Sequence, residues 1–99
     1  MYNGNDRRFT IRGKVLRVSE VTQRQNITTR KLLVLTDEKH PQSLPIEAVN
    51  EKALACEQIY PGDMVECGVK ATSRIIPPKN GQPEKYYPKF ELIYFNVLP

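Results

Sequence analysis

The chain has 99 residues, enough for one domain with a single modest core. Its 15 basic and 11 acidic side chains give a net charge of +4 and a pI near 9.2, which favours a polyanionic partner without requiring one. No apolar run approaches the ~18 residues of a membrane span, and the residues after Met1 do not form a secretory leader. Cys56 and Cys67 lack CxxC spacing, so we expect buried, reduced thiols in a cytoplasmic protein.

The chain begins with a polar segment, residues 1–8, which predicts a flexible N-terminal arm in front of a folded domain over residues 9–99. A period-two pattern then predicts a first strand. One face of this strand carries Phe9, Ile11, Gly13 and Val15. The alternation slips at Leu16, so we expect a β-bulge at residues 15 and 16.

Residues 21–29 are polar and predict a loop, and the apolar run within residues 30–35 predicts a second strand. A turn at residues 37–41 leads to a third strand, Ser43–Val49. Pro45 lies inside this third strand and cannot donate a ladder hydrogen bond. It therefore predicts an edge position or a bulge.

A short helix is expected over residues 50–59, with Asn50 as its N-cap. The sequence Pro61-Gly62-Asp63 predicts a tight turn into a fourth strand that reaches Arg74. Inward residues of this strand should be Val65, Cys67, Val69 and Ala71, which alternate with polar neighbours.

Asn80 and Gly81 predict the tip of a hairpin whose arms are stiffened by proline. A fifth strand is expected over residues 89–98, with Phe90, Leu92 and Tyr94 on one face and Glu91, Ile93 and Phe95 on the other. A short helix between the third and fourth strands of a small all-β chain is the mark of a five-stranded OB-fold barrel.

Basic residues recur on the faces that point away from the predicted core: Arg12, Lys14, Arg17, Arg30, Lys31, Lys70 and Arg74. The loops that flank the usual binding surface of such a barrel add Arg24, Lys79, Lys85, Tyr86 and Tyr87. Cations that follow phosphates and rings that stack on bases suit a single-stranded nucleic acid. The alternative is that the basic residues are ordinary solvent-facing side chains and that both tyrosines cover the barrel mouth.

Consecutive strand residues face opposite ways, so one of the two tyrosines should be exposed. We expect Tyr86 to be available to a base and Tyr87, which precedes Pro88, to pack inward. On this interpretation Tyr86→Ala weakens binding, whereas Tyr87→Ala destabilises the fold.

Catalytic and metal-binding constellations are missing from the sequence. His40 stands beside Pro41 with no nucleophile near it, and one histidine with two separated cysteines does not make a zinc site. Asp37 and Glu38 are adjacent in a turn and point apart. We therefore expect no enzyme activity, no metal, no cofactor and no small-molecule substrate.

The order of these signals resembles bacterial single-stranded DNA-binding proteins and short, uncharacterised OB-fold relatives that lack an acidic C-terminal tail. The residues that carry the resemblance are Gly13-Lys14-Val15, Leu33-Val34-Leu35-Thr36, Leu44-Pro45-Ile46-Glu47-Ala48-Val49, Asn50-Glu51-Lys52-Ala53 and Tyr60-Pro61-Gly62-Asp63-Met64-Val65. The resemblance implies sequence-tolerant binding to single-stranded DNA, or RNA, as a homodimer or larger homo-oligomer, with a role in DNA replication.

The chain also departs from this family. Housekeeping members stack bases on aromatics at the two ends of the third strand, where this chain has Ser43 and Val49, and it contains no tryptophan. These differences favour an accessory binder encoded by a phage or mobile element, with weaker and more electrostatic binding. The alternative function is a protein-interaction or assembly module, which predicts an apolar patch around Tyr94, Phe95 and Leu98 in place of a cationic groove.

Overall fold

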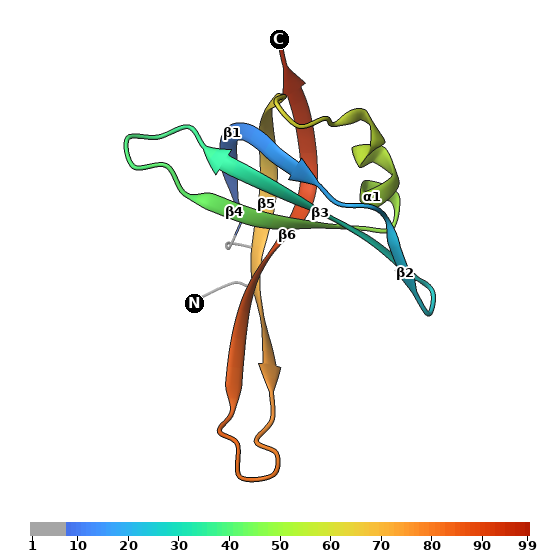
Figure 1. The fold of residues 1–99 in the computed structure, drawn as a ribbon, viewed down its shortest axis with the longest axis vertical. Helices are drawn as coiled ribbons and strands as arrows, with labels where there is room; N and C mark the ends of the chain where they lie inside the picture. Colours follow the sequence, from blue (N-terminus) through green and yellow to red (C-terminus); the bar gives the residue numbers. More distant parts are fainter. Residues whose placement is uncertain (1–7) are drawn as a thin grey trace.

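The computed structural model describes residues 8–99, and of residues 74–76 and 86–87 it describes the backbone only. The elements in chain order are β1 (Arg8–Val18), β2 (Thr22–Arg24), β3 (Ile27–Thr36), β4 (Ser43–Val49), α1 (Glu51–Ala55), the 3-10 turn η2 (Cys56–Gln58), β5 (Met64–Ile76) and β6 (Lys85–Leu98) (Figure 1). The predicted arm over residues 1–8 falls outside the described residues except for Arg8, which already belongs to β1.

Five strands close into a barrel in the order β1-β5-β6-β4-β3, and β1 completes the ring by pairing with β3. All these pairings are antiparallel except the short parallel contact between β4 and β6. The segment of α1 and η2 lies between the third and fourth barrel strands. This arrangement confirms the predicted all-β, five-stranded OB fold with one short helix.

Strand β1 serves both halves of the barrel because it bends. Its first part, from Arg8 to Lys14, pairs with β5, and its second part, from Gly13 to Val18, pairs with β3. The register slips between Val15 and Arg17, which confirms the predicted bulge. At the bend, the amide of Val15 donates to the carbonyl of Asp63 (2.8 Å), and its carbonyl accepts from the amide of Gly62 (2.8 Å).

The turn that meets this bend is the predicted one. The amide of Asp63 donates to the carbonyl of Tyr60 (3.0 Å), and the Asp63 carboxylate accepts from the amide of Tyr60 (2.9 Å). Gly62 has a φ of 98°, which the third residue of a type II turn requires after Pro61.

The core lies inside the barrel and is covered at one end by α1 and η2 (Figure 1). Strand residues fill the barrel: Ile11, Val15, Leu32, Val34, Ile46, Ala48, Val65, Cys67, Val69 and Leu92. Ala53, Cys56 and Ile59 close the end beneath the helical segment. No helix within residues 8–99 is long and apolar enough to cross a membrane.

One local prediction is wrong and another is confirmed only in part. The polar segment over residues 21–29 is largely a hairpin in which β2 pairs with the start of β3 around Gln25 and Asn26, because polar side chains do not prevent a ladder. Asn50 is the N-cap residue of α1, as predicted, but its side chain does not cap the helix; its carboxamide oxygen accepts from the amide of Thr28 (3.1 Å), so the side chain binds β3 instead.

The face pattern predicted for the last strand changes halfway along β6. Val69 pairs with Leu92 and Gly68 pairs with Tyr94, so Ile93 is an extra residue at a bulge. Beyond this bulge Phe95 packs against the core, whereas Tyr94 is 41% exposed and its ring covers Gly68. The predicted grouping of Tyr94 with Phe90 and Leu92 therefore fails.

Strands β5 and β6 continue beyond the barrel as a long arm (Figure 1). The arm ends where Lys79 bridges to Gln82, and the two residues between them, Asn80 and Gly81, both have positive φ. This geometry confirms the predicted hairpin tip. Pro45 pairs with Leu33 on β3, and the β6 contact of β4 starts only at Ile46, so the proline lies where β4 has one partner, as an edge position requires.

Gly13 is required by the close approach of β1 to β3. A Cβ at this position would lie 2.1 Å from the carbonyl oxygen of Leu35, a backbone atom that cannot rotate away. We expect Gly13→Ala to cost about 1–3 kcal/mol of unfolding free energy or more, as overpacking does. Thermal unfolding measures the loss, at about 4–8 °C per kcal/mol for a domain of this size.

Gly68→Ala is the matched comparison, since its added methyl meets only the ring of Tyr94, which is partly exposed and free to shift. Gly68→Ala should lower the melting temperature less than Gly13→Ala. Equal losses of melting temperature in the two variants would show that crowding against the Leu35 backbone is not what requires glycine at position 13.

The two thiols, both buried, give a pH dependence of stability. Burial raises the pKa of Cys67 to about 12, with smaller contributions from Cys56 and Glu66, and burial also raises the pKa of Cys56 against the opposing charge of Arg30. Unfolded thiols ionise above their ordinary value of 9.0, whereas Cys67 in the fold does not until about 12. The free energy of unfolding should therefore fall with rising pH across this window and be unaffected by the thiols below it.

Denaturant titrations of wild type and Cys67→Ala between pH 8 and 11 measure this effect, with the variant showing the shallower decline. At pH 8 the native thiols should resist a disulfide reagent and react on unfolding, because only the thiolate is the nucleophile. Rapid labelling of Cys67 in the native protein would contradict its burial.

Candidate nucleic-acid interface

The outer face of β1, β3 and β4 brings three of the predicted cations together. Antiparallel register places neighbouring side chains of one face in rows across these strands. One row runs from Lys14 through Leu35 to Ser43, a second from Arg17 through Leu33 to Pro45, and a third joins Lys31 to Glu47. This three-strand face is called the β3–β4 face below.

The β3–β4 face combines exposed charge with a partly apolar floor. Lys14, Arg17 and Lys31 are exposed, while Leu33 and Leu35 between them are only half-buried. Glu47 is the acidic member of these rows. The face can therefore hold phosphates along its cationic positions and offer an apolar surface to bases.

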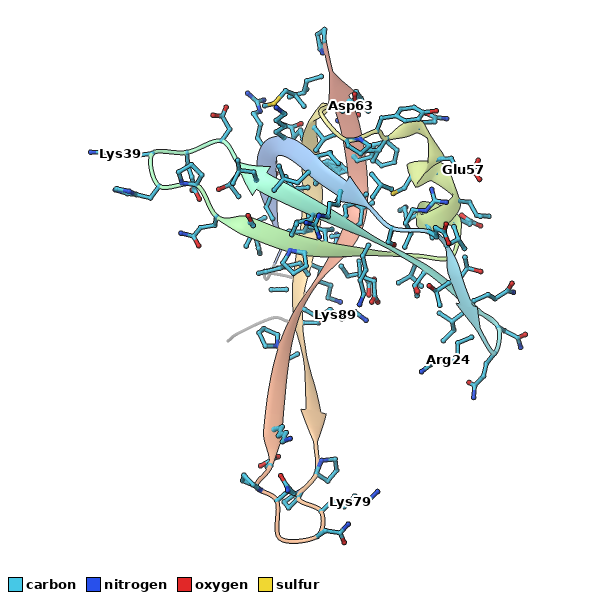
Figure 2. All side chains as sticks on the ribbon, viewed as in Figure 1. Arg24, Lys39, Glu57, Asp63, Lys79 and Lys89 are labelled. Atoms are coloured by element: carbon cyan, nitrogen blue, oxygen red, sulfur yellow. The ribbon has the colours of Figure 1, made fainter. Side chains whose placement is uncertain are left out.

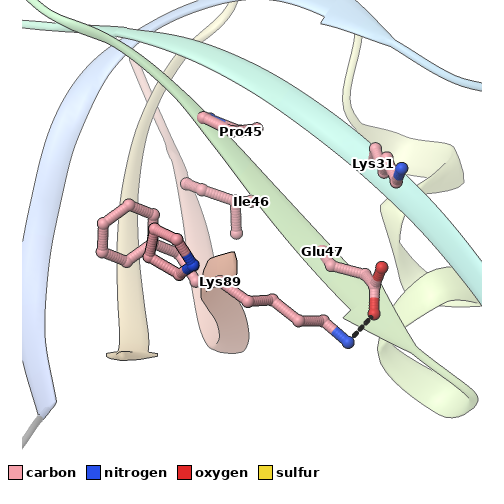
Figure 3. Close-up of a pocket in the computed structure, with 7 residues that line it drawn as sticks. Lys31, Pro45, Ile46, Glu47 and Lys89 are labelled. Atoms are coloured by element: carbon pink, nitrogen blue, oxygen red, sulfur yellow. Dashed lines mark ion pairs between the residues drawn. The ribbon is translucent and has the colours of Figure 1, made fainter. Parts of the chain in front are cut away.

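A pocket opens on this face where β6 leaves the barrel to become the arm. It measures about 420 Å³, within the range of about 300–1,000 Å³ typical of small-ligand sites. Its lining is Lys31, Pro45, Ile46, Glu47, Pro88, Lys89 and Phe90 (Figure 3). The pocket exists because β4 and β6 pair only at Ile46–Phe90 and Glu47–Glu91 before the strands diverge.

The polar side of the pocket is an ion pair between Lys89 and Glu47 (Figure 3). Lys31 is the register partner of Glu47 on the neighbouring strand and also lines the pocket, so a second ammonium group belongs to this side. The Lys89 side chain is 43% exposed and that of Glu47 is 19% exposed. The lysine can therefore move away into solvent, while the carboxylate stays at the pocket.

Arg12 and Lys70 lie elsewhere on the barrel, over the pairing of β1 with β5. Arg12 forms an ion pair with Glu66 (3.2 Å), its register partner on β5. Lys70 stands between Arg8 on β1 and Glu91 on β6. Glu66 therefore offsets the charge of Arg12, Lys70 has one basic and one acidic register neighbour, and neither cation belongs to the rows of the β3–β4 face.

The prediction that Arg30 points outward is wrong. Arg30 pairs with the fully buried Ala48 and shares its inward face, and its Nε atom is shielded from solvent without a hydrogen-bond partner. Its charge acts on Cys56, which places the guanidinium beside the helical segment. Because β3 has no bulge between Arg30 and Val34, Arg30 follows the same alternation as Leu32 and Val34 and points inward. The prediction considered the charge of Arg30 and not this alternation.

Three further predicted cations are on the projecting hairpins (Figure 2). Arg24 is on the β2 hairpin and Lys79 near the tip of the arm, while Lys85 opens β6 on the arm. All three are exposed. The side chains of Arg74, Tyr86 and Tyr87 lie outside the described residues, so the prediction about the two tyrosines stays a prediction.

Sequence reasoning missed the pocket residues Pro45, Glu47, Pro88, Lys89 and Phe90 as a site. The only available signal was the alternation in β4, which puts Pro45 and Glu47 opposite the buried Ile46. Their meeting with the base of the arm depends on the parallel register of β4 and β6, which no local pattern encodes.

Among the described residues, no group of three or more His, Cys, Asp or Glu is placed to hold a metal ion. His40 is exposed in the loop between β3 and β4. In the same loop, the Thr36 hydroxyl donates to the Glu38 carboxylate (2.6 Å) and accepts from the amide of Gln42 (2.8 Å). These contacts order a turn.

A family model described as "Domain of unknown function (DUF3127)" matches residues 10–94, so the chain belongs to that family. No curated protein matches the chain in sequence.

Solved structures share its fold. The mitochondrial single-stranded DNA binding protein Rim1 of S. cerevisiae aligns with a TM-score of 0.62 at 16% identity, over 92% of this chain and 93% of that one. The single-stranded DNA binding protein of Thermus aquaticus aligns with a TM-score of 0.72 at 10% identity, over 93% of this chain and 50% of that one, so this chain spans half its length. The similarity confirms the resemblance in fold predicted from the sequence.

Proposed function

We propose that this member of the family binds single-stranded nucleic acid, with single-stranded DNA as the preferred strand, along its β3–β4 face. The observation that carries the proposal is the clustering of Lys14, Arg17 and Lys31 around a half-buried apolar floor. The fold is also that of proteins named for single-stranded DNA binding. Binding is non-catalytic, and the reduced thiols suit action in the cytoplasm.

The projecting hairpins extend the proposed surface. Arg24 on the β2 hairpin and Lys79 and Lys85 on the arm supply further phosphate contacts, and Tyr86 supplies a ring for a base on the same arm. Arg12 and Lys70 make smaller contributions because both lie outside the rows of the β3–β4 face and Glu66 offsets Arg12. With no aromatic at Ser43 or Val49, the energy of binding is mainly electrostatic.

Binding should therefore depend on salt. Neutralising three or four phosphates gives a slope of log affinity against log salt of roughly −2 to −3, at about −0.7 per contact on a single strand. Fluorescence anisotropy with oligo-dT at several salt concentrations measures the slope. Lys31→Ala and Arg17→Ala should each reduce its magnitude by about 0.7.

Lys52→Ala is the matched control, since Lys52 is an exposed lysine on α1 and the variant has the same net charge. It should leave both slope and affinity close to wild type. An affinity that does not change with salt, or an equal effect of Lys52→Ala, would contradict an electrostatic site on the β3–β4 face.

A second candidate function is self-association or assembly, and exposed apolar side chains together with an unpaired strand edge favour it. Phe9, Tyr94 and Val97 are 42%, 41% and 44% exposed on β1 and β6. The first residues of β1, from Arg8 to Arg12, pair with β5 only, which leaves one edge of this segment without a strand partner among residues 8–99. Unpaired edges and apolar patches are typical docking surfaces. A homodimer or larger oligomer is compatible with binding on the β3–β4 face, because the exposed apolar residues and the unpaired edge do not include Lys14, Arg17 or Lys31.

Light scattering at high micromolar concentration should give at least twice the chain mass of 11.4 kDa. Val97→Lys should shift the protein towards the monomer by placing a charge at an exposed apolar position of β6. Leu54→Lys, at a residue 55% exposed on α1, is the control and should not. A wild-type monomer mass would rule out this assembly, and oligomerisation with no nucleic-acid binding at low salt would favour it as the sole function.

A further inference from the structure

The pocket at the base of the arm has two chemically different sides. Pro45, Pro88 and Phe90 present flat apolar surfaces, and Ile46 closes the floor. Glu47, Lys89 and Lys31 form a polar side that supplies one acceptor and two donors. A ligand that fits both sides is flat and apolar on its faces and carries hydrogen-bond donors and acceptors along one edge.

A nucleobase unstacked from a single strand has this character. The cytosine edge carries the N4 amino donor beside the N3 and O2 acceptors, so N4 can donate to the Glu47 carboxylate while a lysine donates to N3 or O2. Guanine likewise offers amino and imino donors beside the acceptor O6, and adenine offers its N6 amino donor beside the acceptor N1. Thymine has no amino group, and its one donor on this edge, N3–H, lies between O4 and O2, so a carboxylate that accepts from N3–H stands beside two oxygens that repel it.

We propose that this pocket holds one base of the bound strand and that Glu47 makes it prefer a base with an amino donor (cytosine, adenine or guanine) over thymine. The proposal rests on the function proposed above and adds a base preference at one position. Pro45, Pro88 and Phe90 take the role of stacking partners. Elsewhere on the β3–β4 face, contacts to phosphates remain indifferent to sequence.

The ion pair does not block this role. Surface ion pairs are weak, and the Lys89 side chain is 43% exposed, so it can turn from Glu47 towards the base or a phosphate at little cost. Glu47 is held by the β4 ladder beside the buried Ile46 and is the less exposed partner. The carboxylate is therefore the fixed acceptor and Lys89 the movable donor.

The test compares 8-nucleotide dC and dT strands by fluorescence anisotropy at pH 7.5 and one fixed salt concentration, with wild type and variants. Chain flexibility and stacking also differ between the two strands, so the quantity to compare is the dC-to-dT affinity ratio. Glu47→Gln should lower this ratio at least about fivefold, the lower end of what a good base contact contributes. Glu57→Gln, an equal charge change on η2, should leave the ratio unchanged.

Lys89→Gln separates recognition from the ion pair, because it breaks the same pair and keeps the carboxylate. It should weaken both strands but keep the preference for dC. Two results would overturn the base pocket while leaving single-strand binding intact. One is an equal loss of the dC preference in Glu47→Gln and Lys89→Gln. The other is an unchanged dC-to-dT affinity ratio in a Glu47→Gln variant that has the wild-type melting temperature. Absence of binding to either strand would overturn the proposed function itself.

Discussion

Two backbone hydrogen bonds at Val15 fix the bend on which the barrel depends. The amide and carbonyl of this residue are both bound by the turn at Gly62 and Asp63, at the point where β1 leaves β5 and joins β3. Without a bend there, β1 would remain in one sheet and the β3–β4 half would have no partner on that side. The turn is itself rigid, since Asp63 binds Tyr60 through both its backbone and its side chain.

The bend also decides which charges share a surface. Arg12 precedes the bend in β1 and lies over β5, where it forms an ion pair with Glu66. Arg17 follows the bend and lies beside Leu33 and Pro45 on the β3–β4 face. Two arginines only five positions apart therefore have different surroundings. Gly13 makes this possible, since any side chain there would enter the backbone of β3 at Leu35.

Sequence patterns predicted the features that local chemistry controls. Alternation and apolar runs located the five barrel strands, the bulge at Val15 was visible as a slipped period, and the turns at Gly62 and Gly81 were set by residues that tolerate positive φ. Sequence patterns failed where an interaction between distant segments determines the orientation of a side chain. The Asn50 side chain binds the Thr28 amide instead of capping α1, and Phe95 points inward only because Ile93 is an extra residue at the bulge opposite β5.

The predictions for the candidate site also succeeded where local patterns decide and failed where distant segments meet. Lys14, Arg17 and Lys31 were found because exposed strand positions follow from alternation. Arg30 was misplaced because its charge was given more weight than its phase with Leu32 and Val34. The pocket was missed because its two proline residues, Pro45 and Pro88, are 43 positions apart and meet only through the parallel pairing of β4 with β6.

Glu47 places a carboxylate on the otherwise cationic β3–β4 face, beside the pocket. A face meant only to attract phosphates would gain from a neutral residue there, since the carboxylate offsets Lys89 directly and stands opposite Lys31. Its presence lowers the local positive charge at the pocket, where the surface is lined by rings. In the proposed function, charge attracts the strand along the rows of Lys14 and Arg17, and the reduced charge at the pocket leaves room for contacts to a base edge. The proposed site thus separates attraction of the backbone from reading of a base, on strands that the bend at Val15 holds together.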